Sequence, residues 1–275
     1  MPQPRDLDVF SYGGGVQSTA ALVLAAEGVL DCSTFIFANV GNDSEHPGTI
    51  AYLAEVAHPY AAANGIDLVE VQRTWRRGPS TGQPFTLLSV LQRPEGRSFP
   101  IPLRLAGGAP GNRSCTADWK IGQISRWLVE QDHTEANPAR VGLGITIDEI
   151  ERARPGVDPR NPIQDKRYPL LDLGLHRRDC YPIIEQAGLP VPPRSACWFC
   201  PFHSVEEWRR LKRDSPDLFQ QAVGLEQHIN QRRADMGLDK AWLARAMGPL
   251  GQVVDDQPQL PGLEEGGCDS GWCMT

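Results

Sequence analysis

Asp8-Val-Phe-Ser-Tyr-Gly-Gly-Gly-Val-Gln-Ser-Thr-Ala20 places adjacent glycines and a serine between two apolar runs, the first typical of a strand and the second of a helix. Because glycine has no Cβ, Gly13, Gly14 and Gly15 can take positive φ and let the backbone close around an anion. The first amides of the following helix lack intrahelical partners, and the helix dipole adds positive charge there. The stretch predicts either a phosphate-binding loop or a plain strand-to-helix turn.

Two side chains of the same stretch fit a phosphate loop. Ser18 and Thr19 can cap the helix or donate to a phosphate oxygen. The spacing is neither of the two commoner nucleotide motifs, because no Gly-Lys-Ser/Thr closes it and no Gly-x-Gly-x-x-Gly is present.

Runs typical of strands alternate with runs typical of helices along the first 71 residues: strands at 8–11, 33–39 and 67–71, and helices at 18–27 and 46–64. Such alternation predicts an α/β fold of the Rossmann-like kind, a parallel sheet with helices on both faces and ligands at the carboxyl ends of the strands. The glycine loop lies at such an end, and so does the polar segment 39–45.

The rest of the chain divides by composition. Residues 72–114 are rich in Arg, Pro and Gly and receive no assignment, while helices are expected at 116–130 and 177–187 and a short strand at 140–145. A mostly helical C-terminal region should bury Trp208, Leu211, Leu218 and Ala222. We therefore expect a nucleotide-binding α/β domain at 1–190, a Cys-x-x-Cys and helical region at 191–250, and a flexible tail with cysteines at 251–275.

Composition narrows the function classes. No apolar run reaches a membrane span and the first residues lack the apolar core of a signal peptide, so a cytoplasmic location without membrane contact is expected. The formal charge of −7 argues against duplex nucleic acid as a partner of the chain alone. The basic residues at 152–178 alternate with acids, which favours a solvated surface over an anion site.

The cysteines suggest metal or redox chemistry, because a reducing compartment disfavours a disulfide framework. Cys197 and Cys200 have a spacing that suits zinc, an iron-sulfur cluster, a dithiol or two inert buried residues. Cys115 precedes a helix in a polar loop, where Arg113 and Lys120 should favour its thiolate.

The remaining cysteines divide into two pairs. Cys268 and Cys273 lie on the tail, as a redox arm or as incidental thiols. Cys32 and Cys180 lie in apolar or helical stretches, where we expect them to be packing residues.

Together these features resemble the PP-loop ATP pyrophosphatase superfamily. The relevant branch contains phosphoadenylyl-sulfate and adenylyl-sulfate reductases and the ATP pyrophosphatase of bacterial DNA phosphorothioation. The likeness runs from about residue 8 to 203. The family loop Ser-Gly-Gly-x-Asp-Ser matches Gly13-Gly-Gly-Val-Gln-Ser18, with Gly13 in place of the first serine and Gln17 in place of the aspartate.

The resemblance implies a set of nucleotide contacts for ATP with Mg²⁺, or for an adenylyl sulfonucleotide. Asn39, Gly41 and Asn42 match a segment that approaches the adenosine, Gly144 and Arg152 approximate a Gly-x-Arg segment, and Lys120 is a further phosphate contact. The implied contacts of the loop are Ser11, Tyr12, Gly13, Gly14, Gly15, Gln17, Ser18 and Thr19.

The cluster-bearing reductases hold a 4Fe-4S cluster with cysteines that match Cys115, Cys197 and Cys200. Ser114 stands where a further ligand is found, so the fourth iron position is either open or taken by Cys268 or Cys273. In related thiolation enzymes an open iron receives the sulfur that is transferred, whereas in the reductases a tail cysteine attacks the substrate.

Three functions follow. The first is an ATP-dependent sulfur-transfer enzyme that adenylates a small-molecule or nucleotide substrate, releases pyrophosphate and inserts sulfur from a donor protein, with Ser18 and Lys120 in catalytic roles. The second is a sulfonucleotide reductase whose nucleophile is Cys268 or Cys273. The third is a zinc-stabilised nucleotide-binding module of a larger complex.

Overall fold

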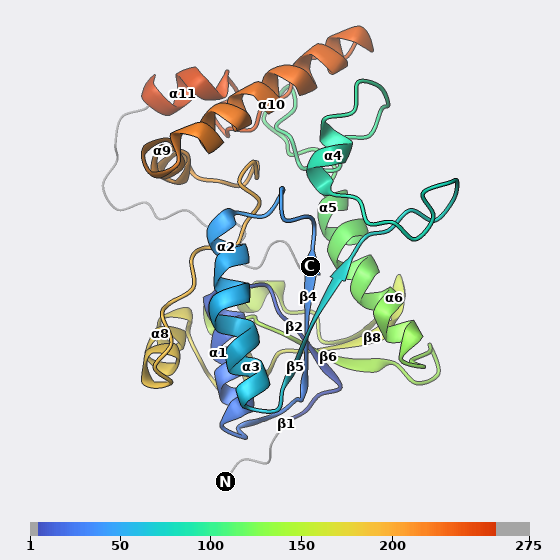
Figure 1. Cartoon of the computed structure of the whole chain (residues 1–275), viewed down its shortest axis with the longest axis vertical. Helices are drawn as coiled ribbons and strands as arrows, with labels where there is room; N and C mark the ends of the chain where they lie inside the picture. The colour runs from blue at the N-terminus through green and yellow to red at the C-terminus, as the bar shows by residue number, and fades with distance from the viewer. Residues whose placement is uncertain (1–4, 257–275) are drawn as a thin grey trace.

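The computed structural model describes residues 5–256. Its main sheet has six strands in the order β5-β4-β2-β6-β8-β7, parallel except for the edge strand β7 (Figure 1). The strands are β1 (Arg5–Asp6), β2 (Val9–Ser11), β3 (Leu30–Asp31), β4 (Thr34–Asn39), β5 (Asp67–Gln72), β6 (Ala139–Leu143), β7 (Gly156–Asp158) and β8 (Asn161–Arg167).

The helices alternate with these strands and then dominate the last part of the described chain. They are α1 (Val16–Ala26), α2 (Pro47–Tyr52), η1 (Leu53–Ala57), α3 (His58–Ala63), α4 (Leu87–Leu91), α5 (Ser114–Thr116), η2 (Ala117–Ile121), α6 (Gly122–Glu130), η3 (Ile147–Arg152), α7 (Pro169–Asp172), α8 (Arg177–Gln186), α9 (Val205–Asp214), α10 (Pro216–Asp235) and α11 (Leu250–Asp256). None of the helices within residues 5–256 combines the length and the apolar character that crossing a membrane requires.

Both faces of the sheet are covered by helices, as the sequence predicts. Successive side chains of a strand point to opposite faces, so Phe10 and Phe35 join one core with α1, α3 and α8. Val9 and Ile36 point the other way and pack with Leu128 of α6. Parallel β2 lies at the centre, between β4 and β6, which puts the glycine loop in the middle of the carboxyl edge.

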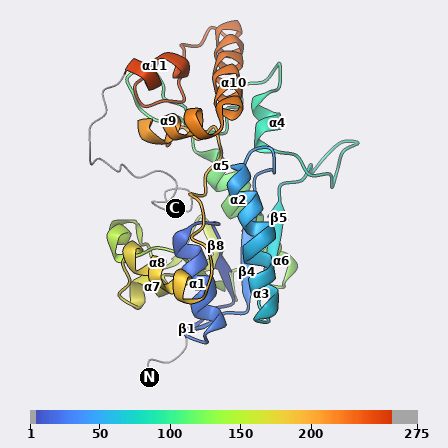
Figure 2. The ribbon, with the colours of Figure 1, turned by 60° about the vertical axis from the view of Figure 1, so that its left-hand side comes forward.

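A second core lies beyond that edge and is built from two separate stretches of chain. Leu87 and Leu91 of α4 pack with Trp208 of α9 and Ile229 of α10, and Trp198, within the Cys-x-x-Cys segment, joins them. Figures 1 and 2 show α4, α9, α10 and α11 grouped together above the sheet. The helical region therefore includes part of the segment 72–114 that the sequence leaves unassigned.

The expected flexible tail from residue 251 is wrong for its first residues. Helix α11 continues to residue 256, because Leu250 and Val254 are buried in the second core. The Glu226 carboxylate, on α10, accepts hydrogen bonds of 2.8 Å from the amides of Leu243 and Leu250 and so fixes the approach to α11. Residues 257–275, with Cys268 and Cys273, lie outside the described part.

The preference for a solvated surface at 152–178 is also corrected. Part of this stretch forms the antiparallel hairpin β7–β8, where Asp158 pairs with Arg160 at 3.1 Å and with Lys166 at 3.8 Å. Arg152, Arg154 and Lys166 line a cavity rather than a fully solvated face. The sequence pattern did not indicate these strands because their charged side chains pair with neighbouring charges and no apolar face alternates along them.

Candidate functional site

The glycine loop is a tight turn with a defined helix cap. Gly14 has φ of +75°, and a Cβ there would lie 3.1 Å from Cγ2 of Thr49. The hydroxyl of Ser18 accepts from the amide of Gly15 at 3.1 Å and donates to its carbonyl at 3.0 Å. The capping role of Ser18 is thus confirmed, and the loop needs glycine at position 14 for its conformation and for space.

Tyr12 and Thr19 support the loop from within the fold. The Tyr12 hydroxyl and Thr19 Oγ1 are 2.9 Å apart, and both side chains are buried. Burial raises the pKa of Tyr12 above its usual range. Ser11, at the end of β2, is also buried. These three side chains form the back of the loop, so its backbone amides are the groups best suited to meet an anion.

Gln17, Gly144 and Arg152 come together beside the loop. The Gln17 amide donates to Glu149 at 3.2 Å and accepts from Arg177 at 3.1 Å, and Glu149 pairs with Arg152 at 2.7 Å. A Cβ on Gly144 would lie 3.3 Å from that of Gln17. An aspartate at position 17 could not donate to Glu149, so the departure from the family pattern matches its surroundings.

The segment after β4 is held rigidly. Asn39 accepts from the amide of Gly41 at 2.7 Å and donates to Asn42 at 2.7 Å and to Glu70 at 3.1 Å. Gly41 has φ of +125°, and a Cβ there would overlap Thr86 at 2.5 Å. The segment is therefore shaped in advance at the carboxyl edge, beside the glycine loop, as the sequence predicts.

The Cys-x-x-Cys segment lies directly against both loops. Ser195 donates to the carbonyl of Gly13 at 2.5 Å, and the Ala196 carbonyl accepts from the His46 amide at 3.0 Å. Cys197 forms an antiparallel bridge with Glu45. The contact between Ser195 and Gly13 spans 182 residues of sequence and attaches the cysteine segment to the glycine loop.

Three cysteine side chains lie within electrostatic reach of one another and of Lys120. Burial raises the pKa of Cys197 well above its usual range and raises that of Cys200 to about 11. The neighbouring cysteines raise both pKa values further, and Lys120 lowers them. Burial also raises the pKa of Cys115, although Lys120 and Arg113 lower it. The two cations do favour the thiolate of Cys115, as the sequence predicts, but burial has the larger effect on its pKa.

Lys120 and Glu45 form the charged centre of this cluster. Burial alone would lower the pKa of Lys120, but the negative charges of Glu45 and the cysteines raise it. Glu45 is 1% exposed, and neither carboxylate oxygen has a partner with good hydrogen-bond geometry. Burial raises its pKa, against the opposing effects of Lys120 and the Val40 amide.

Glu45 is a residue that sequence reasoning missed. Its only signal is its place in the polar run Gly41-Asn-Asp-Ser-Glu-His46, which follows a buried strand. The run is polar enough for a surface loop. Glu45 is buried because it is bridged to Cys197 and lies beneath the second core.

Cys32 and Cys180 are confirmed as packing residues, since both are buried in the core around α1 and α8. Within the described range 5–256, no group of three or more His, Cys, Asp or Glu side chains is arranged to hold a metal ion. A metal proposal therefore rests on the chemistry and proximity of the three thiols.

No protein-family model matches the chain, and no curated protein matches it significantly.

Proposed function

We propose that the protein is an ATP-dependent sulfur-transfer enzyme that works at the junction of the glycine loop and the cysteine cluster. The observation that supports this most is the hydrogen bond from Ser195 to the Gly13 carbonyl, two residues before Cys197. A nucleotide phosphate on the loop amides would lie next to thiols that suit sulfur or metal chemistry.

The chain's own groups divide the work of nucleotide binding. The amides from Gly13 to Gly15 and the start of α1 would bind the phosphates and stabilise charge on the departing pyrophosphate. The preformed turn at Asn39–Asn42 would take the adenosine. Gln17 supplies no carboxylate to a Mg²⁺ ion carried by ATP. The carboxylate of Glu149, which accepts a hydrogen bond from Gln17, would be the nearby acidic group for that ion.

The proposed reaction has two displacements. An oxygen of the acceptor attacks the α-phosphorus of ATP, the bond to the β-phosphate oxygen breaks, and pyrophosphate leaves. Sulfide, or sulfur delivered by a donor protein with a thiol as reductant, then attacks the activated carbon, and AMP leaves with the oxygen. Lys120 lies within electrostatic reach of the three cysteines, where its charge would favour their thiolate forms.

Cys115, Cys197 and Cys200 supply the soft thiol ligands that an iron-sulfur cluster takes and lie near a buried cation, although in the described part of the chain they are not arranged to hold a metal ion. A 4Fe-4S cluster with one open iron would supply a binding position for the transferred sulfur. Zinc is the alternative occupant, and it would leave the nucleotide chemistry without this sulfur carrier.

The test begins with full-length protein purified without oxygen. We expect iron and acid-labile sulfide in the wild type, their loss in Cys197→Ser, and their retention in Cys180→Ala, whose cysteine is buried in a different core. A colourless protein that carries zinc alone would contradict the cluster.

The reaction itself is tested with ATP and sulfide. We expect pyrophosphate release that depends on an added cell extract as the source of the acceptor. This release should be lost in the variant that combines Ser18→Ala with Gly14→Val. Thiol-dependent sulfite release from adenylyl sulfate or its 3′-phosphate, without any pyrophosphate from ATP, would instead identify a sulfonucleotide reductase.

A further inference from the structure

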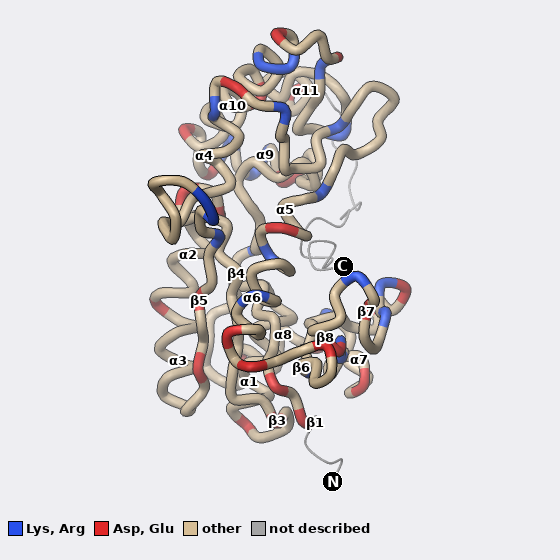
Figure 3. Tube along the Cα trace, turned by 90° about the vertical axis from the view of Figure 1, so that its right-hand side faces the viewer, with Lys and Arg blue, Asp and Glu red and all other residues tan. Residues whose placement is uncertain are grey.

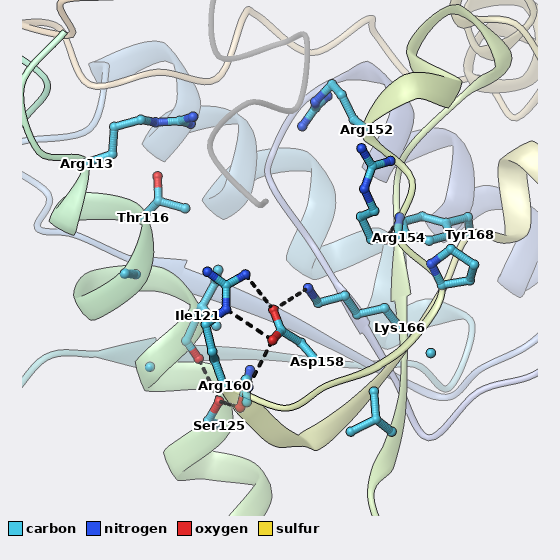
Figure 4. A pocket seen from close by; sticks show the side chains of 16 residues that line it. Arg113, Thr116, Ile121, Ser125, Arg152, Arg154, Asp158, Arg160, Lys166 and Tyr168 are labelled. Atoms are coloured by element: carbon cyan, nitrogen blue, oxygen red, sulfur yellow. Dashed lines mark hydrogen bonds and ion pairs between the residues drawn. The ribbon is translucent and has the colours of Figure 1, made fainter.

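A cavity of about 810 Å³ opens between α5–α6 on one wall and the β7–β8 hairpin on the other. Figure 3 shows lysines and arginines gathered at the hairpin, and Figure 4 shows the cavity itself. We call it the hairpin pocket. The charged side chains that line it are Arg113, Arg152, Arg154, Asp158, Arg160 and Lys166.

The two ends of the hairpin pocket differ in charge. At one end, Arg113 and Arg152 approach from opposite walls and Arg154 points toward Arg152 (Figure 4). Burial lowers the pKa of Arg152, and the neighbouring Arg113 lowers it further. The three guanidinium groups bring positive charge to this end of the cavity, and Glu149 pairs with Arg152. Neighbouring cations of this kind are stabilised by an anion between them.

At the other end a carboxylate offsets part of the positive charge. Asp158 pairs with both Arg160 and Lys166, and Arg160 is 91% exposed. Ser125 donates a hydrogen bond to the side chain of Asn161 at 3.0 Å, so these two polar groups are partners of each other. An uncharged part of a ligand fits this end, because it displaces none of these pairs.

The cationic end touches both halves of the proposed active site. Arg113 lines the pocket and lies two residues before Cys115 in the chain. Arg152 reaches the glycine loop through Glu149 and Gln17. A ligand held at this end would therefore lie between the nucleotide loop and the thiols.

We propose that the hairpin pocket binds the acceptor substrate, and that this acceptor is a small organic phosphate held at the end formed by Arg113, Arg152 and Arg154. Its role as acceptor rests on the proposed function, but the binding of an organic phosphate does not. The volume is in the range of small-molecule sites, and guanidinium groups match phosphate oxygens in geometry and charge.

The probe is ribose 5-phosphate, titrated into full-length protein by calorimetry. We expect binding in the wild type and about tenfold weaker binding in Arg154→Gln, because a charge-assisted contact to phosphate is lost. Arg160→Gln is the matched control: its charge is paired and exposed at the far end, so affinity should stay within twofold. Equal affinities of Arg154→Gln and the wild type, or equal binding of inorganic phosphate and ribose 5-phosphate, would overturn the proposal.

Asp158→Asn gives a test with the opposite sign. Loss of this carboxylate frees Arg160 and Lys166, so a sugar bisphosphate such as fructose 1,6-bisphosphate should bind several-fold more tightly than to the wild type. Unchanged circular dichroism would show that the variant is folded and therefore carries the extra positive charge. A weaker or unchanged affinity of that folded variant for the bisphosphate would contradict the proposed arrangement of charges.

Two further titrations separate this proposal from the proposed function. The combined Ser18→Ala and Gly14→Val variant should lose ATP but keep ribose 5-phosphate. Loss of both ligands would show that the pocket belongs to the nucleotide site and would overturn the inference. Retained sugar-phosphate binding with no pyrophosphate release from any acceptor would leave the pocket standing and count against the sulfur-transfer reaction alone.

Discussion

The hydrogen bonds of Gln17 explain why a glutamine stands at this position of the glycine loop. The family that the sequence resembles carries an aspartate at the matching position, whereas the Gln17 amide can donate to Glu149 and accept from Arg177 at once. The sequence identifies the departure but not its cause, because Glu149 and Arg177 lie more than 130 residues away. Gly14 and Ser18 were predictable, since their roles depend on local backbone geometry.

Gln17→Asp should therefore destabilise the protein by about 1–3 kcal/mol, because it places a second carboxylate against Glu149 and removes a hydrogen bond. Urea unfolding measures the change. Adding Glu149→Gln should recover part of the loss, since an amide at 149 can donate to the new carboxylate. Additive losses in the double variant would contradict the pairing.

At the scale of elements, the strands at 8–11, 33–39 and 67–71 and the helices that follow them were predictable because each carries an apolar pattern of the right period. The hairpin β7–β8 and the short helix α4 were not. The side chains of the hairpin are charged and pair within the hairpin, while α4 is flanked by Pro and Arg and is fixed by packing against α9 and α10.

The Asp8 carboxylate ties β2 to β6, and this tie should depend on pH. Asp8 accepts from the amide and the guanidinium of Arg140, and the guanidinium hydrogen bond lowers its pKa despite partial burial. Because its pKa is lowered in the folded state, ionised Asp8 stabilises the fold at pH values above its ordinary pKa near 4. This stabilisation is lost as the pH falls through the pKa of the folded state.

Asp8→Asn should cost about 1 kcal/mol at pH 7, and the difference from the wild type should shrink below about pH 4. Chemical unfolding across this range measures it. A difference that stays constant down to pH 2 would show that the charge of Asp8 contributes nothing.

Helix α10 offers a test with a gain in stability. Gly224 is exposed within this helix, and a Cβ there would meet no atom within 4 Å. Gly224→Ala should stabilise the protein by about 0.5–1 kcal/mol, because alanine loses less backbone entropy in a helix. A lower melting temperature would mean that α10 is not helical at this position.

For the whole molecule, Arg232 links the C-terminal helices to the segment that follows α4. It is 4% exposed, donates to the carbonyls of Leu91 and Arg93 at 3.1 and 3.0 Å, and lies 4.2 Å from the ring centre of Phe99. This link holds the second core over the carboxyl edge of the sheet. No local pattern in the sequence indicates it.

Arg232→Met should destabilise the protein by about 2 kcal/mol, because buried carbonyls lose their donor. The neighbouring Arg233→Met is the control, and it should change stability by less than about 0.5 kcal/mol. Equal melting temperatures of the two variants would show that the link is dispensable.

The same scale explains what could be foreseen of the site. The resemblance groups Cys115 with Cys197 and Cys200, and the structure brings them together. Glu45 and the hairpin pocket could not be foreseen, since the second core and the β7–β8 hairpin create them by enclosing side chains that read as surface residues.

The central claim is that the glycine loop beside the cysteine segment binds a nucleotide. Titration calorimetry of ATP with Mg²⁺ tests it on the wild type, on Gly14→Val and on the control Gly224→Ala. A side chain at Gly14 costs about 1–2 kcal/mol at its positive φ and meets Thr49, so circular dichroism must first show that the variant is folded. The account predicts ATP binding to the wild type and to Gly224→Ala and none to Gly14→Val. Equal affinity of a folded Gly14→Val variant would contradict it.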